Sequence, residues 1–176
     1  MLITISGLPG SGTSTAARIV ASAFDLEHLD GGTVFRAMAQ ERGMSLADFA
    51  LLAERDDTID RALDERLSQR ALSGDVLIES RLAGWLAARA GAVGLKIWVD
   101  CDEIERARRV GGRDAHDAEE AMATNRCREA SERARYQAYY DIDLRDLSVY
   151  DLVVDSTTTN AESVAAHIVE QVKAKA

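Results

Sequence analysis

A chain of 176 residues, 47% hydrophobic and 29% charged, is long enough for one soluble globular domain with a buried core. Its net charge of −9 argues against nucleic acid as a partner, because binding to a phosphate backbone needs a basic surface. The sequence has no apolar run of the ~18 residues that a membrane helix needs, and Met1 is not followed by a basic, cleavable leader. We therefore expect no membrane partner and a cytoplasmic protein.

Apolar periodicity along the chain predicts short strands that alternate with helices. The predicted strands are the mostly apolar runs 2–6, 26–29, 75–80, 95–100 and 150–156. The predicted helices are 14–24, 31–41, 45–56, 56–74, 81–91, 102–109, 118–139 and 160–176. This alternation is typical of an α/β fold whose parallel sheet is covered on both faces. The helices between the second and third strands depart from simple alternation, and we expect them to cover a substrate.

The loop between the first strand and the first helix is rich in glycine. It fits the phosphate-binding pattern G-x-x-x-x-G-K-[ST] at Gly7, Gly12 and Ser14, with Thr13 in place of the usual lysine. Glycines let successive backbone N–H groups point inward, and the helix that follows adds its positive N-terminal dipole. Neither contribution needs a lysine, and Ser14 or Thr15 still offers a hydroxyl to Mg²⁺. The loop therefore predicts a phosphate site whose missing charge comes from arginine.

Arginines follow the predicted strand ends, where ligands bind in open parallel sheets. Arg36 lies in the first turns of a predicted helix, and Arg81 lies just beyond the third strand. Glu79 ends that strand and is placed to hold a water on Mg²⁺. In a second group, Arg106, Arg109 and Arg113 flank a glycine pair that we predict to be a hinge, and Arg128 and Arg135, seven residues apart, share one face of a helix. We interpret this group as a lid that closes over transferring phosphates.

Cysteines and histidines are few and widely spaced. Cys101 and Cys127 have neither metal-ligand nor redox spacing, and we interpret both as reduced and structural. His28, His116 and His167 are equally scattered, so spacing predicts neither a zinc site nor a catalytic dyad.

Four segments together resemble one family, the cytidylate kinases of the archaeal type, within the nucleoside monophosphate kinases. They are "ISGLPGSGTST", "GGTVFRAMAQERGMSLADF", "ESRLAGWLA" and "REASERARYQAYYDIDLRDLSVYDLVV". The likeness covers nearly the whole chain and implies a single domain over 1–176. It implies a three-layer phosphate-loop kinase fold with a five-stranded parallel sheet. A helical monophosphate-binding insertion over about 30–73 and a short lid over about 109–117 belong to that fold.

The resemblance also implies a reaction and a set of residues. The reaction is ATP with CMP or dCMP giving ADP with CDP or dCDP, with Mg²⁺ as cofactor. The ATP phosphates are assigned to Gly7, Leu8, Pro9, Gly10, Ser11, Gly12, Thr13, Ser14 and Thr15. Arg36 and Arg81 are assigned to the CMP phosphate. Arg109, Arg113, Arg128 and Arg135 are assigned to the transferring group. Ser14 and, through water, Glu79 are assigned to the metal, and the "VVDSTTT" segment is placed near the adenine.

Several alternatives remain open at this stage. Asp60, Asp64 and Arg66 are candidates for reading cytosine, or simply an exposed helix face with i,i+4 ion pairs. Another acceptor, UMP or AMP, is an alternative. A second alternative is a protein that binds nucleotides but lost catalytic turnover when it lost the lysine. Against this alternative, the residues expected to bind both phosphates are all present. The tyrosines are predicted to pack in the core rather than to form a base-stacking surface: Tyr136, Tyr139, Tyr140 and Tyr150. We expect a monomer.

Overall fold

The structure is a computed structural model that describes the backbone of residues 1–114 and 117–175. Five parallel strands form one sheet in the order β2-β3-β1-β4-β5. They are β1 (Leu2–Gly7), β2 (Glu27–Asp30), β3 (Val76–Glu79), β4 (Leu95–Asp100) and β5 (Leu152–Asp155). All five strands predicted from the sequence are confirmed.

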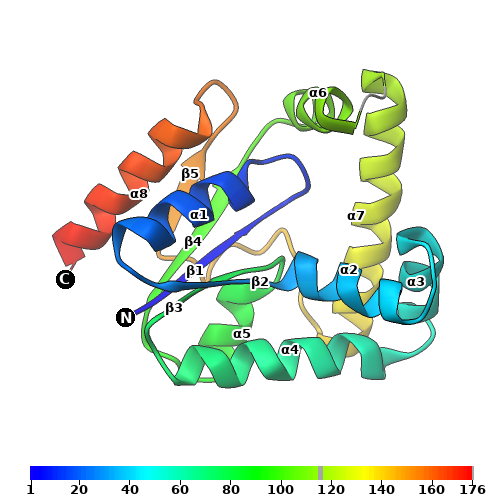
Figure 1. The fold of residues 1–176 in the computed structure, drawn as a ribbon, viewed down its shortest axis with the longest axis horizontal. Helices are drawn as coiled ribbons and strands as arrows, with labels where there is room; N and C mark the ends of the chain where they lie inside the picture. Colours follow the sequence, from blue (N-terminus) through cyan, green and yellow to red (C-terminus); the bar gives the residue numbers. More distant parts are fainter. Residues whose placement is uncertain (115–116, 176) are drawn as a thin grey trace.

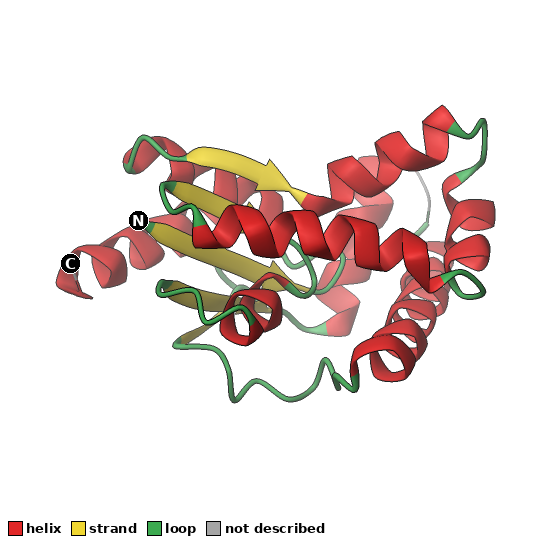
Figure 2. Cartoon of the chain, turned by 90° about the horizontal axis from the view of Figure 1, so that it is seen from below, coloured by secondary structure: helices red, strands yellow, loops and turns green. Residues whose placement is uncertain are grey.

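Helices cover both faces of this sheet, as Figure 2 shows. On one face, α1 (Thr13–Ala23) and α8 (Ala161–Lys175) pack on strand side chains such as Ile3 and Val99. On the other face, α4 (Asp57–Leu72) and α5 (Ala83–Arg89) pack on Val76 and Ile78. The two faces bury separate apolar clusters, because successive strand side chains point to opposite sides. The three-layer α/β fold is therefore confirmed.

The remaining helices gather beyond the carboxyl ends of the strands, while both termini lie on the opposite side (Figure 1). They are α2 (Gly31–Glu41), α3 (Leu46–Ala53), α6 (Glu103–Asp114) and α7 (Ala118–Tyr140). Ser45 caps α3, because its hydroxyl accepts a hydrogen bond from the N–H of Asp48 at 3.1 Å. A small apolar cluster around Phe49 and Ile59 holds the inserted helices together.

One predicted boundary is wrong. The helix expected to end near Arg109 continues to Asp114, so the glycine pair Gly111–Gly112 lies inside α6 rather than in a loop. Glycine weakens a helix by about 1 kcal/mol relative to alanine, which is why a break was predicted there. Packing of α6 along α7 outweighs this local preference. The predicted lid over about 109–117 thus begins within a helix, and residues 115–116 lie outside the described part of the chain.

Two smaller expectations concern aromatic and sulfur side chains. Both cysteines are free: Cys101 is buried, as a structural cysteine should be, but Cys127 is exposed on α7. Tyr136 is buried in the cluster beneath α4 and α5. The ring of Tyr150 packs against Trp98 at a centroid distance of 5.3 Å. These two tyrosines have the packing role that the sequence predicted. Among the described residues, no helix is both long and apolar enough to span a membrane.

Candidate active site

The loop after β1 has the backbone geometry of an anion-binding nest. Gly10 and Gly12 have φ values of 87° and 91°, which only glycine adopts readily. A Cβ atom at Gly10 would lie 2.6 Å from the carbonyl oxygen of Arg106, so a side chain there is also excluded by space. The helix α1 begins directly afterwards at Thr13, which aims its N-terminal N–H groups at the loop. The loop therefore has the local structure that the glycine pattern predicted.

Glu79, at the carboxyl end of β3, is bonded to both hydroxyl residues at the start of α1. Its Oε1 accepts hydrogen bonds from the hydroxyls of Thr13 at 2.9 Å and Ser14 at 2.6 Å. Its Oε2 lies 3.0 Å from Nε2 of His28, on the neighbouring strand β2. The residue that replaces the usual lysine thus fastens a buried carboxylate to the phosphate loop. Because the three histidines are widely spaced in the sequence, their positions gave no reason to expect His28 in this site.

Arg81 links the same loop to α7. Its Nη1 donates to the carbonyl oxygen of Gly7 at 3.0 Å, and its Nε donates to Glu132 at 2.9 Å. Glu132 also accepts from Nε of Arg128 at 3.0 Å. Burial alone would raise the pKa of Glu132, but the charges of Arg81 and Arg128 outweigh it and hold that pKa below its ordinary value. Arg81 and Arg128, predicted to serve two different phosphates, therefore meet on one carboxylate.

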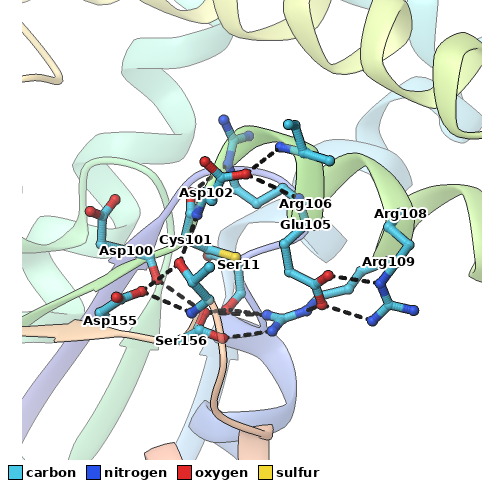
Figure 3. A network of polar contacts seen from close by, with 12 residues as sticks. Ser11, Asp100, Cys101, Asp102, Glu105, Arg106, Arg108, Arg109, Asp155 and Ser156 are labelled. Carbon is cyan, nitrogen blue, oxygen red and sulfur yellow. Dashed lines mark hydrogen bonds and ion pairs between the residues drawn. The ribbon is translucent and has the colours of Figure 1, made fainter.

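Arg109 reaches the phosphate loop from α6 (Figure 3). Its Nη2 donates to the carbonyl oxygen of Ser156 at 2.6 Å, and its Nε donates to Glu105 at 2.8 Å. The Ser156 hydroxyl in turn donates to the carbonyl oxygen of Ser11, in the loop, at 2.8 Å. Hydrogen bonds from Arg108 and Arg109 lower the pKa of Glu105 to about 2. The segment after β5, predicted to lie near the adenine, is thus tied to the loop.

Arg106, one turn earlier on α6, makes a second clamp. Its side chain is 5% exposed and donates to the carbonyl oxygens of Cys101 at 3.1 Å and Pro9 at 3.3 Å. It also pairs with Glu129 on α7. Arg106 was predicted only as one of the lid arginines, and it instead holds the loop against the two helices.

Two of the predicted arginines differ in exposure and partners. Arg36 lies in α2 with 54% of its side chain exposed, bonded to Asp30 at 3.3 Å and Thr33 at 2.8 Å. Arg135 is buried, and its Nη1 donates to both carboxylate oxygens of Asp60 at 2.9 Å. Arg135 therefore points toward the insertion helix α4 in this structure, away from the position predicted for a lid arginine. The side chain of Arg113, also assigned to the lid, lies outside the described residues.

The three candidates for reading cytosine separate by burial. Asp60 and Asp64 are buried on one side of α4, whereas Arg66 is exposed. The alternative interpretation, an exposed helix face, is therefore wrong for the two aspartates. Arg66 is exposed, as that interpretation predicted. Hydrophobic periodicity could not show this, because a buried aspartate reads as a surface residue in the pattern.

Asp64 carries a testable consequence for stability. Burial, together with the smaller effect of the nearby charge of Asp60, raises its pKa to about 7. A folded-state pKa above the unfolded value means that the folded protein binds more protons, so stability falls as pH rises from ~4 to ~7. Asp64→Asn should therefore stabilise the protein more at pH 8 than at pH 5, by about 2 to 3 kcal/mol. Urea unfolding at the two pH values measures the difference. The exposed Glu65→Gln serves as control, and an equal effect of Asp64→Asn at both pH values would contradict the prediction.

The order of the strands, the glycine loop that opens α1 and the arginines around it define a phosphate-loop kinase. Comparisons with solved structures agree on the fold. A shikimate kinase from Bacteroides thetaiotaomicron superposes with a TM-score of 0.65 at 12% identity, covering 98% of both chains. A structure from Chloroflexus aurantiacus, described as that of a kinase, gives a TM-score of 0.61 at 19% identity, covering 97% of both chains. Residues 3–137 match the family model described as an AAA domain.

Curated relatives narrow the class to one family. A cytidylate kinase from Haloquadratum walsbyi is 47% identical over 89% of this chain and 81% of its own length. One from Halobacterium salinarum is 42% identical over 99% of this chain and 90% of its own length. One from Pyrococcus horikoshii is 43% identical over 94% of this chain and 85% of its own length. The chain belongs to the cytidylate kinase family.

Proposed function

We propose that the protein transfers the γ-phosphoryl group of ATP to CMP or dCMP, giving ADP and CDP or dCDP. The observation that carries this proposal is Arg81, whose guanidinium bonds the phosphate loop through Gly7 and α7 through Glu132. One partly buried cation thus lies between the donor loop and the helix that carries further arginines. The proposed acceptor, CMP or dCMP, rests on the similarity of the chain to relatives that are named cytidylate kinases.

The donor phosphates are assigned to the loop from Gly7 to Thr15. Its backbone N–H groups and the dipole of α1 provide positive potential without a lysine. Arg109 is the residue that we propose to replace the missing charge, because it already contacts the loop through Ser11 and Ser156. Closure of α6 and α7 over the loop would bring this guanidinium toward the transferring group and exclude water.

The acceptor phosphate is assigned to Arg36 and Arg81, and Arg128 on α7 shares the carboxylate of Glu132 with Arg81. Guanidinium groups suit this task because their planar donors match phosphate oxygens and remain charged at all relevant pH values. In phosphoryl transfer, catalysis consists mainly of positioning and charge neutralisation, so these arginines need not form or break bonds. Glu132 holds Arg81 and Arg128 in place before substrate arrives, and Asp30 holds Arg36.

The cofactor assigned to the site is Mg²⁺. The Ser14 hydroxyl and the Glu79 carboxylate, 2.6 Å apart, are the hard oxygen donors that this ion prefers. Among the described residues, no group of three or more histidine, cysteine, aspartate or glutamate side chains gathers as a metal site. That fits Mg²⁺, which is usually held by one or two protein oxygens, waters and substrate phosphates. When bound, the ion would neutralise charge on the ATP phosphates. We propose that the protein works as a monomer in the cytoplasm.

An acceptor panel tests the proposal. Purified protein with ATP and Mg²⁺ receives CMP, dCMP, UMP or AMP separately, and release of ADP is measured. We expect the highest kcat/KM with CMP or dCMP, because a site built to hydrogen-bond one base rejects others strongly. Preference for UMP or AMP would mean another acceptor. ATP binding without turnover on any acceptor would instead mean a nucleotide-binding protein.

A further inference from the structure

We infer that Arg106 and Ser156 position the phosphate loop and that Glu129 of α7 positions Arg106. This inference rests on the proposed function, because it takes the loop as the ATP site. Neither Arg106 nor Ser156 is open to a nucleotide, since the two residues are only 5% and 2% exposed. Both donate hydrogen bonds to carbonyl oxygens of the loop. They are therefore positioning residues rather than catalytic ones.

Arg106 holds the peptide group between Pro9 and Gly10. Its Nη1 donates to the carbonyl oxygen of Pro9 at 3.3 Å. In a trans peptide group, the C=O of one residue and the N–H of the next point in opposite directions. No peptide bond among the described residues is cis, so the hydrogen bond to Pro9 also sets the direction of the Gly10 N–H. The backbone of α6 contacts this peptide group as well, because a Cβ atom at Gly10 would lie 2.6 Å from the Arg106 carbonyl oxygen.

Ser156 holds the peptide group between Ser11 and Gly12 in the same way. Its hydroxyl donates to the carbonyl oxygen of Ser11 at 2.8 Å, and the carbonyl oxygen of Asp100 lies 3.0 Å away as a second acceptor. Figure 3 shows Ser156 beside Ser11. The hydrogen bond to Ser11 therefore sets the direction of the Gly12 N–H, which points away from Ser156.

The N–H groups that these contacts orient are available to an anion. Among the described residues, the N–H groups of Gly10 and Gly12 donate to no acceptor. The N–H of Ser11, between them, is already used, since it donates to the carbonyl oxygen of Leu8 at 3.1 Å. Backbone N–H groups that converge in a glycine loop form an anion-binding site. The two anchored peptide groups thus carry donors for the phosphates of ATP.

Glycine is the reason why the loop needs such anchors. The φ values of 87° and 91° at Gly10 and Gly12 allow the nest, but glycine adopts the opposite sign of φ about as readily. Rotation of either peptide group would turn its N–H out of the site. Pro9 and Ser11 are buried, so their carbonyl groups need donors, and the two side chains provide these donors in only one orientation of each peptide group.

The guanidinium of Arg106 is itself held on two sides. Its Nε donates to the carbonyl oxygen of Cys101, directly after β4, at 3.1 Å, and its Nη1 pairs with Glu129 on α7. Glu129 lies one helical turn before Glu132, the partner of Arg81. Since Arg81 also donates to a carbonyl oxygen of the loop, α7 supports the loop through two arginines.

The double variant Arg106→Leu with Glu129→Leu is the test. It removes one positive and one negative charge, so the net charge of the protein stays the same and neither partner is left unpaired. We expect ATP to bind about tenfold more weakly, and also tripolyphosphate, which carries the phosphates of ATP without the nucleoside. The affinity for CMP should stay within about twofold of wild type, because distant sites contribute independently. Calorimetric titrations without Mg²⁺ measure all three affinities.

Ser156→Ala tests the second anchor with a smaller change. It removes the hydroxyl that donates to Ser11 and should weaken binding of ATP and tripolyphosphate about fivefold. The hydroxyl also accepts from Nη1 of Arg109 at 3.2 Å, but Nη2 of Arg109 keeps its hydrogen bond to the main-chain carbonyl oxygen of residue 156. Binding of CMP should again be unchanged.

Glu103→Leu with Arg126→Leu is the matched control. This ion pair also joins α6 to α7 across 23 residues, as the pair of Arg106 with Glu129 does, but it is exposed and makes no hydrogen bond to the loop. The control should bind all three probes as the wild type does. Melting temperatures of all variants show that each one is folded.

The outcomes separate this inference from the proposed function. If Arg106→Leu with Glu129→Leu binds ATP and tripolyphosphate as tightly as the control does, the inference is wrong. An equal loss of affinity for CMP would mean general damage to the fold and would also overturn it, as would a wild-type protein that binds neither ATP nor tripolyphosphate. A wild-type protein that binds both but phosphorylates no acceptor would overturn the proposed function alone, and the three affinities would still decide the inference.

Discussion

Replacing Arg81 with leucine is expected to lower kcat/KM for CMP by about 10³-fold or more. Arg81 is assigned to the acceptor phosphate next to the donor loop, and phosphoryl transfer depends mainly on this kind of positioning and charge neutralisation. Arg81 also bonds the loop at Gly7, so its loss removes a cation between donor and acceptor. Steady-state kinetics with CMP varied at saturating ATP measures the effect. Arg81→Lys keeps the charge but lacks the planar guanidinium. Its kcat/KM for CMP should therefore lie between those of the wild type and Arg81→Leu.

The same substitution should destabilise the protein by about 3 kcal/mol, because it leaves Glu132 buried with only Arg128 as partner. A double variant, Arg81→Leu with Glu132→Leu, removes both charges and should recover most of this stability. Its kcat/KM should stay as low as that of Arg81→Leu. Recovery of activity along with stability would mean that Arg81 acts only through folding and that its assignment to the acceptor phosphate is wrong.

The sequence predicted the fold well because the fold depends on local patterns. Four of the five strands are short, mostly apolar runs bounded by polar or glycine residues, and the loop after β1 carries the glycine spacing of a phosphate-binding loop. Even β2, with only four residues, was found. The end of α6 was missed because Gly111 and Gly112 are poor helix residues, and their helical state depends on packing against α7.

The candidate site was predicted less completely, because its contacts join distant parts of the chain. His28 meets Glu79 across 51 residues, and Arg135 meets Asp60 across 75. No spacing rule connects such pairs. Ser156, which ties α6 to the loop, lies in a segment that the family resemblance placed near the adenine, but its bond to Ser11 spans 145 residues. The residue types in the sequence were enough to identify the arginines as candidates. The residues that each arginine contacts could be identified only from the structure.

Glu79→Gln is expected to lower kcat at least about 100-fold and to raise the Mg²⁺ concentration needed for half-maximal activity. The reason is charge: glutamine keeps the size of the side chain but cannot attract the cation as a carboxylate does. ATP affinity measured without Mg²⁺ should stay within about twofold of wild type, because the loop binds phosphate through backbone N–H groups. Titration of activity against Mg²⁺ and calorimetry with free ATP together measure these effects.

Thr13 provides the matched control for this prediction, since its hydroxyl donates to the same oxygen of Glu79 as that of Ser14. Thr13→Val removes only the hydrogen bond and should leave the charge of Glu79 in place. If Thr13→Val reproduced both the loss of kcat and the increased need for Mg²⁺, orientation of Glu79 rather than its charge would be the essential property. If it did neither, while Glu79→Gln did both, the charge of Glu79 would be the essential property and the hydrogen bond from Thr13 would be dispensable. The lysine missing from this loop would then have its replacement elsewhere, with Arg109 the first candidate because it already contacts the loop.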